Sequence, residues 1–146
     1  QNMFLLPPRG GLSFAFLDLI NIIDFEGNIY VIDDYKYDLT LEEIKKITDN
    51  DLTFNYYYDA IKKVFRDGDI IVGYSLGCIY ALLLAEKLEK DKSIDKCILI
   101  EGFLNFVQNE KPQLEEVKNE IISEDKNIFE KYSKDFIDKI IEIIKL

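Results

Sequence analysis

The 146-residue chain contains no histidine and no tryptophan. The missing histidine excludes the imidazole that most often serves as a general acid or base near neutral pH, and with it the commonest metal ligand. Cysteine is scarce as well, and Cys78 and Cys97 are not spaced as a pair of ligands. We therefore expect no metal site, and no glycine-rich phosphate loop is present in the sequence.

Long apolar runs and an excess of basic residues are also missing. No apolar stretch approaches membrane-spanning length, and the first residues lack the basic and apolar regions of a secretion signal. The net charge of −10 disfavours a nucleic-acid partner, because phosphate binding needs a basic face. We expect a soluble cytoplasmic protein with no membrane or nucleic-acid partner, whose cysteines are free thiols in a reducing compartment.

The residues that are present indicate one globular domain. Hydrophobic residues make up 48% of the chain, enough to bury a core at this length. Short apolar runs predict four strands, at 3–6, 29–32, 70–73 and 97–100, and the first two are expected to be buried. Helical patterns separate these runs, so the sequence predicts an α/β fold with a mainly parallel sheet of about four strands flanked by helices.

Local signals mark helix starts and turns in the first part of the chain. Thr40 and Glu43 have the spacing of a capping box, and Ser13 is placed to cap a helix of its own. Asp33 and Asp34 follow the second predicted strand and are interpreted as exposed turn residues.

The pattern changes after residue 106. Two helices with charged outer faces are predicted, at 114–122 and 128–144, and no further strand is visible. We therefore divide the domain into a core, 1–106, and a helical C-terminal segment, 107–146.

The most informative motif is the turn Gly73–Gly77, with the sequence GYSLG, between an apolar strand and an apolar helix predicted to lie in the core. This is the layout of a nucleophile elbow, in which glycines at 73 and 77 let strand and helix approach closely and Ser75 is lifted out of the turn. The alternative is that Ser75 is only a small residue in a tight turn.

A second motif, Pro7–Gly11 with the sequence PPRGG, follows the first predicted strand. Together with the elbow and the segments 29–33 and 97–102, it resembles the thioesterase domains of nonribosomal peptide and polyketide synthesis, which belong to the α/β-hydrolase superfamily. The resemblance covers most of the chain and implies a partial α/β-hydrolase fold in which 107–146 is a lid-like segment.

The resemblance also implies roles for individual residues. Ser75 would be the nucleophile, and the backbone amides of Leu76 and Arg9 would form the oxyanion hole. Glu101 stands where the family has the aspartate that orients the catalytic histidine. The alternative for Glu101 is a solvated charge at a strand end.

The missing histidine is the departure from the family, which carries it after the lid and two further strands. We expect a C-terminally truncated hydrolase that is nearly inactive as it stands, because removal of a triad member costs about 10⁴ to 10⁶ in rate. No lysine can be placed beside Ser75 to replace it.

Two functions follow from the resemblance. The first is a thioesterase that takes an acyl or peptidyl chain from the phosphopantetheine thiol of a carrier protein, with no cofactor bound directly. The alternative is a non-catalytic module that binds the carrier protein or the acyl chain. A sheet edge and an apolar final helix make a homo-oligomer a possible further partner.

Overall fold

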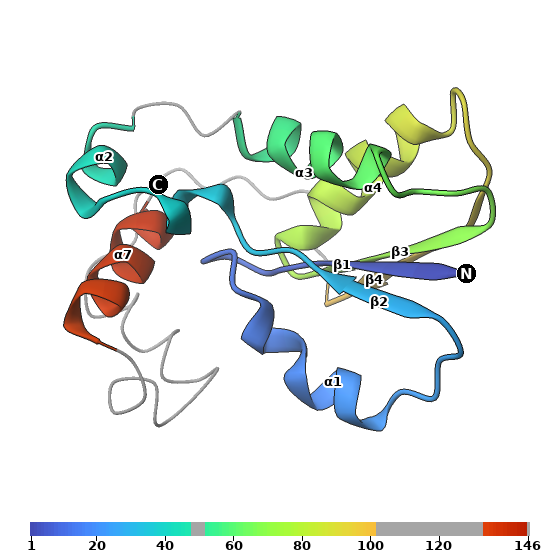
Figure 1. Cartoon of the computed structure of the whole chain (residues 1–146), viewed down its shortest axis with the longest axis horizontal. Coiled ribbons are helices and arrows are strands. Elements are labelled where there is room, and N and C mark those ends of the chain that lie inside the picture. The colour runs from blue at the N-terminus through green and yellow to red at the C-terminus, as the bar shows by residue number, and fades with distance from the viewer. Residues whose placement is uncertain (48–51, 102–132, 146) are drawn as a thin grey trace. The chain divides into compact units, whose positions relative to one another are not determined.

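The computed structural model describes residues 1–47, 52–101 and 133–145 (Figure 1). These residues divide into two compact units, which are described separately. The first contains 1–34 and 52–101, and the second contains 35–47 and 133–145. None of the helices in these three ranges is long and apolar enough to cross a membrane.

The first unit is built on a four-stranded parallel sheet, which confirms the predicted fold class. Its strands, in the spatial order β2-β1-β3-β4, are β1 (Asn2–Leu6), β2 (Asn28–Val31), β3 (Asp69–Tyr74) and β4 (Ile94–Ile100). The central strands β1 and β3 are buried almost throughout. The expectation of a buried second strand is wrong, because β2 lies at an edge of the sheet among the described residues and its residues are half-buried or exposed. β4, at the other edge, is likewise half-buried or exposed.

Helices cover both faces of this sheet (Figure 1). The short 3-10 helix η1 (Ser13–Phe16) leads into α1 (Leu17–Ile22) on one face. The helices α3 (Leu52–Lys62) and α4 (Gly77–Leu88) lie on the other. This three-layer arrangement follows from the crossover connections that parallel strands require.

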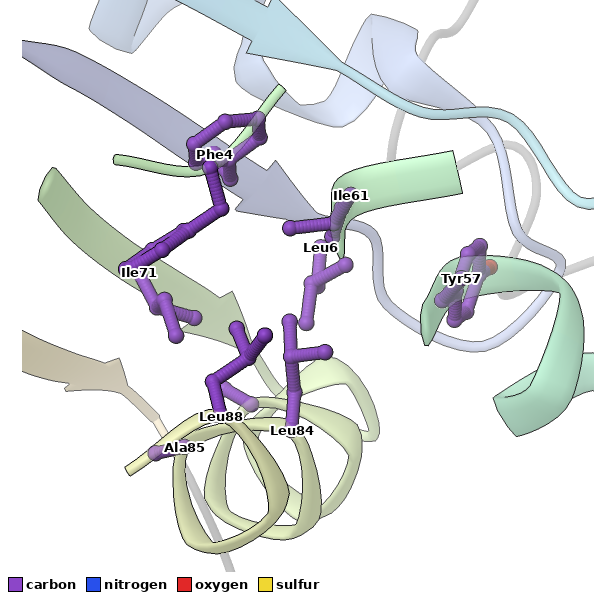
Figure 2. Close-up of a cluster of buried hydrophobic side chains, with 10 residues drawn as sticks. Phe4, Leu6, Tyr57, Ile61, Ile71, Leu84, Ala85 and Leu88 are labelled. Atoms are coloured by element: carbon purple, nitrogen blue, oxygen red, sulfur yellow. The ribbon is translucent and has the colours of Figure 1, made fainter. Parts of the chain in front are cut away.

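The core between the sheet and the pair α3 and α4 is drawn in Figure 2. Phe4, Leu6 and Ile71 of the sheet belong to one buried cluster with Leu84 and Leu88 of α4. Alternate residues of the same strands face η1, because successive side chains of a strand point to opposite sides. A continuous apolar run in β1 and β3 is therefore buried on both faces.

Helix α4 is less buried than its sequence predicts. Leu82 and Leu83 are 39% and 43% exposed, whereas Ala81 and Leu84 are fully buried. The expectation of a core helix is thus correct for one face only, because an apolar sequence on every side does not reveal which side meets the sheet.

A buried carboxylate joins the amino ends of the two central strands. Asp69, 1% exposed at the start of β3, accepts hydrogen bonds from the main-chain N–H and the side-chain amide of Asn2, at 2.7 and 2.9 Å. The main-chain N–H of Arg66 donates to it at 2.8 Å. These bonds fix β1 beside β3 at the end of the sheet opposite the elbow.

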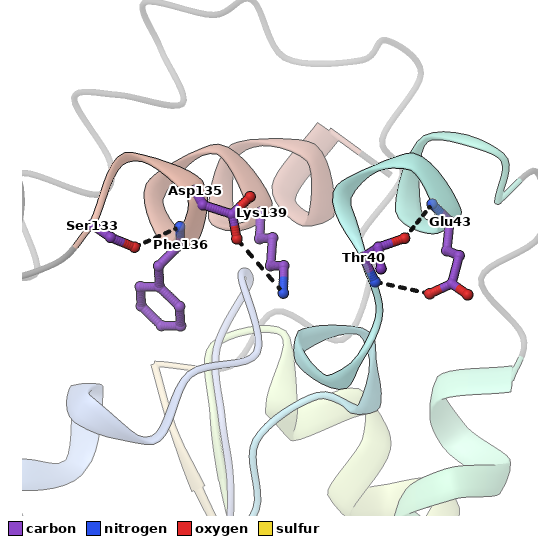
Figure 3. A network of polar contacts seen from close by, with 6 residues as sticks. All are labelled: Thr40, Glu43, Ser133, Asp135, Phe136 and Lys139. Carbon is purple, nitrogen blue, oxygen red and sulfur yellow. Dashed lines mark hydrogen bonds and ion pairs between the residues drawn. The ribbon is translucent and has the colours of Figure 1, made fainter.

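The second unit consists of η2 (Tyr35–Asp38), α2 (Leu41–Lys45) and α7 (Lys134–Lys145). Figure 3 shows that Thr40 and Glu43 form the predicted capping box, with bonds of 2.8 and 3.2 Å. Of the helix expected at 128–144, the part from Lys134 onward forms α7, and the hydroxyl of Ser133 before it accepts a bond from the N–H of Phe136. Residues 128–132 lie outside the described residues. The helix expected at 114–122 lies outside the described residues.

Candidate active site

The turn between β3 and α4 has the geometry of a strand-to-helix elbow. β3 ends at Tyr74, α4 begins at Gly77, and Ser75 lies between them with φ of +51°. A serine at positive φ is strained, because its Cβ crowds the following carbonyl group. Its side chain is partly exposed at the carboxyl edge of the sheet, which is the edge where parallel sheets bind ligands.

The two glycines of the motif are required by the close approach of three backbone segments. A Cβ on Gly73 would lie 2.5 Å from the carbonyl oxygen of Gly77. A Cβ on Gly77 would collide with the carbonyl oxygen of Leu6 and lie 2.6 Å from that of Pro7. The spacing of glycines in the sequence therefore encodes this tight turn and seats the end of β1 directly against it.

The elbow is also bonded to the last strand. The N–H of Ser75 donates to the carbonyl of Ile100 at 2.9 Å. The buried thiol of Cys78 contacts the carbonyls of Gly73 and Ile100 at 3.2 and 3.4 Å. Burial raises the pKa of the Cys78 thiol, which therefore remains a neutral S–H donor. These bonds hold the turn in place beside the end of β4.

Glu101 lies beside this turn. Tyr74 pairs with Ile100 in the register of β3 and β4, so Ser75 and Glu101 are the next residues of two adjacent strands. Glu101 is exposed and also has φ of +51°. The structure thus brings the two residues that the resemblance paired to one edge of the sheet.

The proline-containing loop lies on the other side of the elbow, after β1. Pro7 and Pro8 are buried, and the N–H of Gly11 donates to the carbonyl of Pro8 at 2.9 Å, which closes a turn around Arg9. Gly10 and Gly11 follow at φ of 93° and 69°, values that favour glycine. Arg9 and Leu76 are therefore placed on the two backbone segments that meet at Gly77.

The prediction of exposed turn residues after β2 is correct for Asp33 and wrong for Asp34. Asp34 is buried, 6% exposed, although it was interpreted as an exposed turn residue together with Asp33. Ser13 makes no side-chain cap, since the residue before η1 is Leu12 and the carboxylate of Asp33 accepts the N–H of Ser13 instead, at 2.6 Å. Nothing in the local sequence indicates this bond, because its partners are twenty residues apart in the chain.

The cysteine and carboxylate side chains of the described residues form no metal-binding cluster. No group of three or more cysteine, aspartate or glutamate side chains there could hold a metal ion. Cys78 and Cys97 are free, as predicted, and burial also raises the pKa of the Cys97 thiol. Among the described residues, this edge of the sheet carries the hydroxyl group of Ser75, the carboxylate of Glu101 and the backbone amides around them.

No protein-family model matches the chain, and no curated protein matches its sequence. Solved structures do match it. The Vlm2 thioesterase domain bound with a dodecadepsipeptide has a TM-score of 0.78 at 17% identity, covering 99% of this chain and 65% of that one.

Two further thioesterase domains match over 99% of this chain. The surfactin-cyclising domain SrfTE has a TM-score of 0.67 at 16% identity, with 60% of its own chain covered. The NocB domain, solved as a covalent complex with a fluorophosphonate nocardicin G analogue, has a TM-score of 0.68 at 15% identity, with 62% covered. Our chain thus spans less than two thirds of the length of these three structures. It has the α/β-hydrolase fold of thioesterase domains, as its sequence predicted.

Proposed function

We propose that the chain is the elbow-bearing part of a thioesterase and that Ser75 accepts an acyl or peptidyl chain from a carrier-protein thioester. The observation that carries this proposal is the strained φ of Ser75 at an elbow packed against the loop Pro7–Gly11. Strain of this kind is retained where the surrounding structure enforces it, which is frequent at catalytic groups. The similarity to three thioesterase domains supports the same assignment.

In the proposed reaction the hydroxyl oxygen of Ser75 attacks the thioester carbonyl. A C–O bond forms, the carbonyl oxygen becomes an oxyanion, and the main-chain N–H groups of Leu76 and Arg9 donate to it. The oxyanion then collapses, the C–S bond breaks, and the phosphopantetheine thiol of the carrier leaves with the proton that serine gave up. Water or a nucleophile within the acyl chain completes release.

The step that this chain performs poorly is removal of the serine proton. A serine hydroxyl is a weak nucleophile without an adjacent base, and the chain has no histidine. Glu101 is proposed to orient an imidazole in the complete site, as the third group of a triad does. We expect acylation of Ser75 in this chain to be slower by about 10⁴-fold or more than in a complete triad.

Imidazole added to the buffer tests the proposal directly, because it supplies the missing base. The chain is incubated with an acyl-pantetheine thioester, with and without imidazole, and the acyl adduct is located by mass spectrometry. We expect imidazole to accelerate the formation of an adduct on Ser75. Ser75→Ala should abolish this adduct, whereas Ser93→Ala, at an exposed serine before β4, should leave it unchanged.

A binding module is the second candidate, and the absence of histidine is the observation that favours it. The same experiment separates the two functions. No adduct on Ser75 at any imidazole concentration, together with retained binding of the acyl-pantetheine, would support the module and end the enzyme assignment. In either case we propose the cytoplasm as the compartment, where both free cysteines would stay reduced.

A further inference from the structure

Two consecutive aspartates at the end of β2 are bonded to the segment that follows the loop Pro7–Gly11. The carboxylate of Asp33 accepts the main-chain N–H of Ser13 at 2.6 Å. The main-chain N–H of Asp34 donates to the carbonyl of Gly11 at 2.8 Å. Both bonds join segments that lie about twenty residues or more apart in the sequence. They are possible because β2 lies beside β1 in the sheet.

The fit around Gly11 shows how tightly this end of β2 holds the loop. A Cβ on Gly11 would collide with the Cβ of Asp34 and lie 3.3 Å from its carboxylate carbon. The loop itself is closed by the bond from Gly11 to Pro8, and the carbonyl oxygen of Pro7 lies against Gly77 of the elbow. The loop is therefore bounded by the elbow at its start and by the two aspartates at its end.

We propose that Asp33 is a positioning residue for acylation of Ser75, acting through the loop that carries Arg9. This inference rests on the proposed function, in which the N–H of Arg9 donates to the oxyanion. Asp33 acts through the backbone rather than on Ser75 itself: its carboxylate accepts the N–H of Ser13, where the loop passes into η1. Release of this bond lets the far end of the loop move and shifts the Arg9 amide away from the oxyanion.

The chemistry makes such a shift costly. An oxyanion-hole donor stabilises the transition state only when it is already in place, and displacement of a positioned group by about 1 Å can cost up to about 10²-fold in rate. Because Asp33 acts only indirectly, through the loop, we expect Asp33→Ala to lower the rate of acylation of Ser75 roughly tenfold. Asp33→Asn keeps an oxygen that accepts the N–H of Ser13, and should therefore retain most of the rate.

Asp67 provides a matched control. Its exposed carboxylate accepts the main-chain N–H of Ser93 at 2.9 Å, the same kind of bond that Asp33 makes with Ser13. It precedes β3 at the amino end of the sheet, away from the elbow. Asp67→Ala thus removes an equivalent contact and an equal charge without touching the loop.

The test measures two quantities in the full chain and in Asp33→Ala, Asp33→Asn and Asp67→Ala. The first is the rate at which a fluorophosphonate labels Ser75 in imidazole buffer, where the serine oxygen bonds to phosphorus, fluoride leaves and imidazole takes the proton. The second is hydrogen–deuterium exchange of the amides in residues 9–13. We expect slower labelling and faster exchange in Asp33→Ala alone.

Each other result overturns the inference. If Ser75 labels equally fast in the full chain and in Asp33→Ala, or if exchange in residues 9–13 is unchanged, Asp33 has no positioning role and the proposed function still stands. If Asp33→Asn slows the labelling of Ser75 as much as Asp33→Ala does, the effect comes from the charge of Asp33 and not from its hydrogen bond. If Asp67→Ala slows the labelling of Ser75 as much as Asp33→Ala does, the effect comes from a general loss of stability and not from positioning of the loop. No labelling of Ser75 in the full chain ends the proposed function, and this inference with it.

Discussion

Ser75, at the strand-to-helix elbow, has an unfavourable backbone conformation. Its φ of +51° suits glycine, and any residue with a Cβ pays about 1 kcal/mol there. We therefore expect Ser75→Gly to be more stable than Ser75→Ala by about 1 kcal/mol in urea unfolding, since only glycine relieves the strain. Neither variant can form the acyl adduct.

Glu101 offers an internal comparison for this prediction, because it has the same φ at the end of the neighbouring strand. Glu101→Gly should likewise exceed Glu101→Ala in stability. Equal stabilities of the glycine and alanine variants at position 75 would contradict a left-handed serine.

Gly77 is constrained by space more than by its torsion angles. Gly77→Ala would place a methyl group against the carbonyls of Leu6 and Pro7, where only backbone could give way. We expect a loss of at least about 3 kcal/mol in the free energy of unfolding, or failure to fold.

Gly68→Ala is the matched control for Gly77→Ala. Gly68 has φ of +86°, but nothing lies within 4 Å of the added Cβ. Its substitution should lower stability by only about 1 kcal/mol, the torsional part of the effect. Similar losses in the two variants would show that the close approach at Gly77 is wrong.

At the scale of single elements, the start of β3 depends on one carboxylate. Asp69→Ala removes the acceptor of three N–H groups and leaves buried donors without partners. We expect a loss of about 3 kcal/mol or more in urea unfolding.

Asp91→Ala, at an exposed position after α4, should change stability by less than about 0.5 kcal/mol. Asp69→Asn keeps one acceptor oxygen and should fall between the two. If Asp69→Ala were as stable as Asp91→Ala, the two central strands would not depend on this contact.

The sequence predicted elements well where their signal is local. The central strands were found because each is a continuous apolar run, and the capping box at Thr40 because its two members are three residues apart. The start of α7 was missed although Ser133, a good N-cap, stands before it. The periodic apolar positions of the sequence continue toward residue 128 and so do not mark where α7 begins.

The candidate site was predictable to a similar extent. The elbow and the proline loop are short motifs, and the structure places them in contact through Gly77 and Pro7. The bonds of Asp33 and Asp34 to the loop were not predictable, because they depend on β2 lying beside β1. Contacts between distant segments follow from the topology, which no local pattern encodes.

At the scale of the whole molecule, the two thiols make stability depend on pH. Burial raises the pKa of Cys78 and Cys97 above the ordinary value of 9.0, so the unfolded chain loses these protons first. Their contribution to stability is complete below that value and is lost as the pH rises through the folded-state pKa.

We expect the free energy of unfolding to fall more steeply as the pH rises above about 9 in the full chain than in a variant with both cysteines changed to alanine. The double variant is the control for lysine and tyrosine ionisation. Parallel slopes in the two proteins would contradict the shifted pKa values.

The position of β4 at an edge of the described sheet predicts self-association. Among the described residues β4 pairs only with β3, and its residues Ile98 and Leu99 are each 38% exposed. An exposed apolar edge strand is a template for pairing with another chain. We expect the molar mass from light scattering to rise with concentration, and Ile98→Lys to suppress this rise.

Leu17→Lys is the control for a general effect of charge, because Leu17 is 56% exposed on α1, away from that edge. It should associate as the unmodified chain does. A concentration-independent monomer mass for the unmodified chain would remove the basis of the prediction.

The crowding at Gly77 has a consequence for how such chains change over generations. Replacement of this glycine is opposed by the carbonyls of Leu6 and Pro7 whether or not the neighbouring hydroxyl reacts. Selection for folding alone would therefore preserve the glycines of the motif in a descendant that had lost its chemistry. Among related chains, loss of activity should therefore appear as replacement of Ser75 or of the base that takes its proton. Gly73 and Gly77 should be retained.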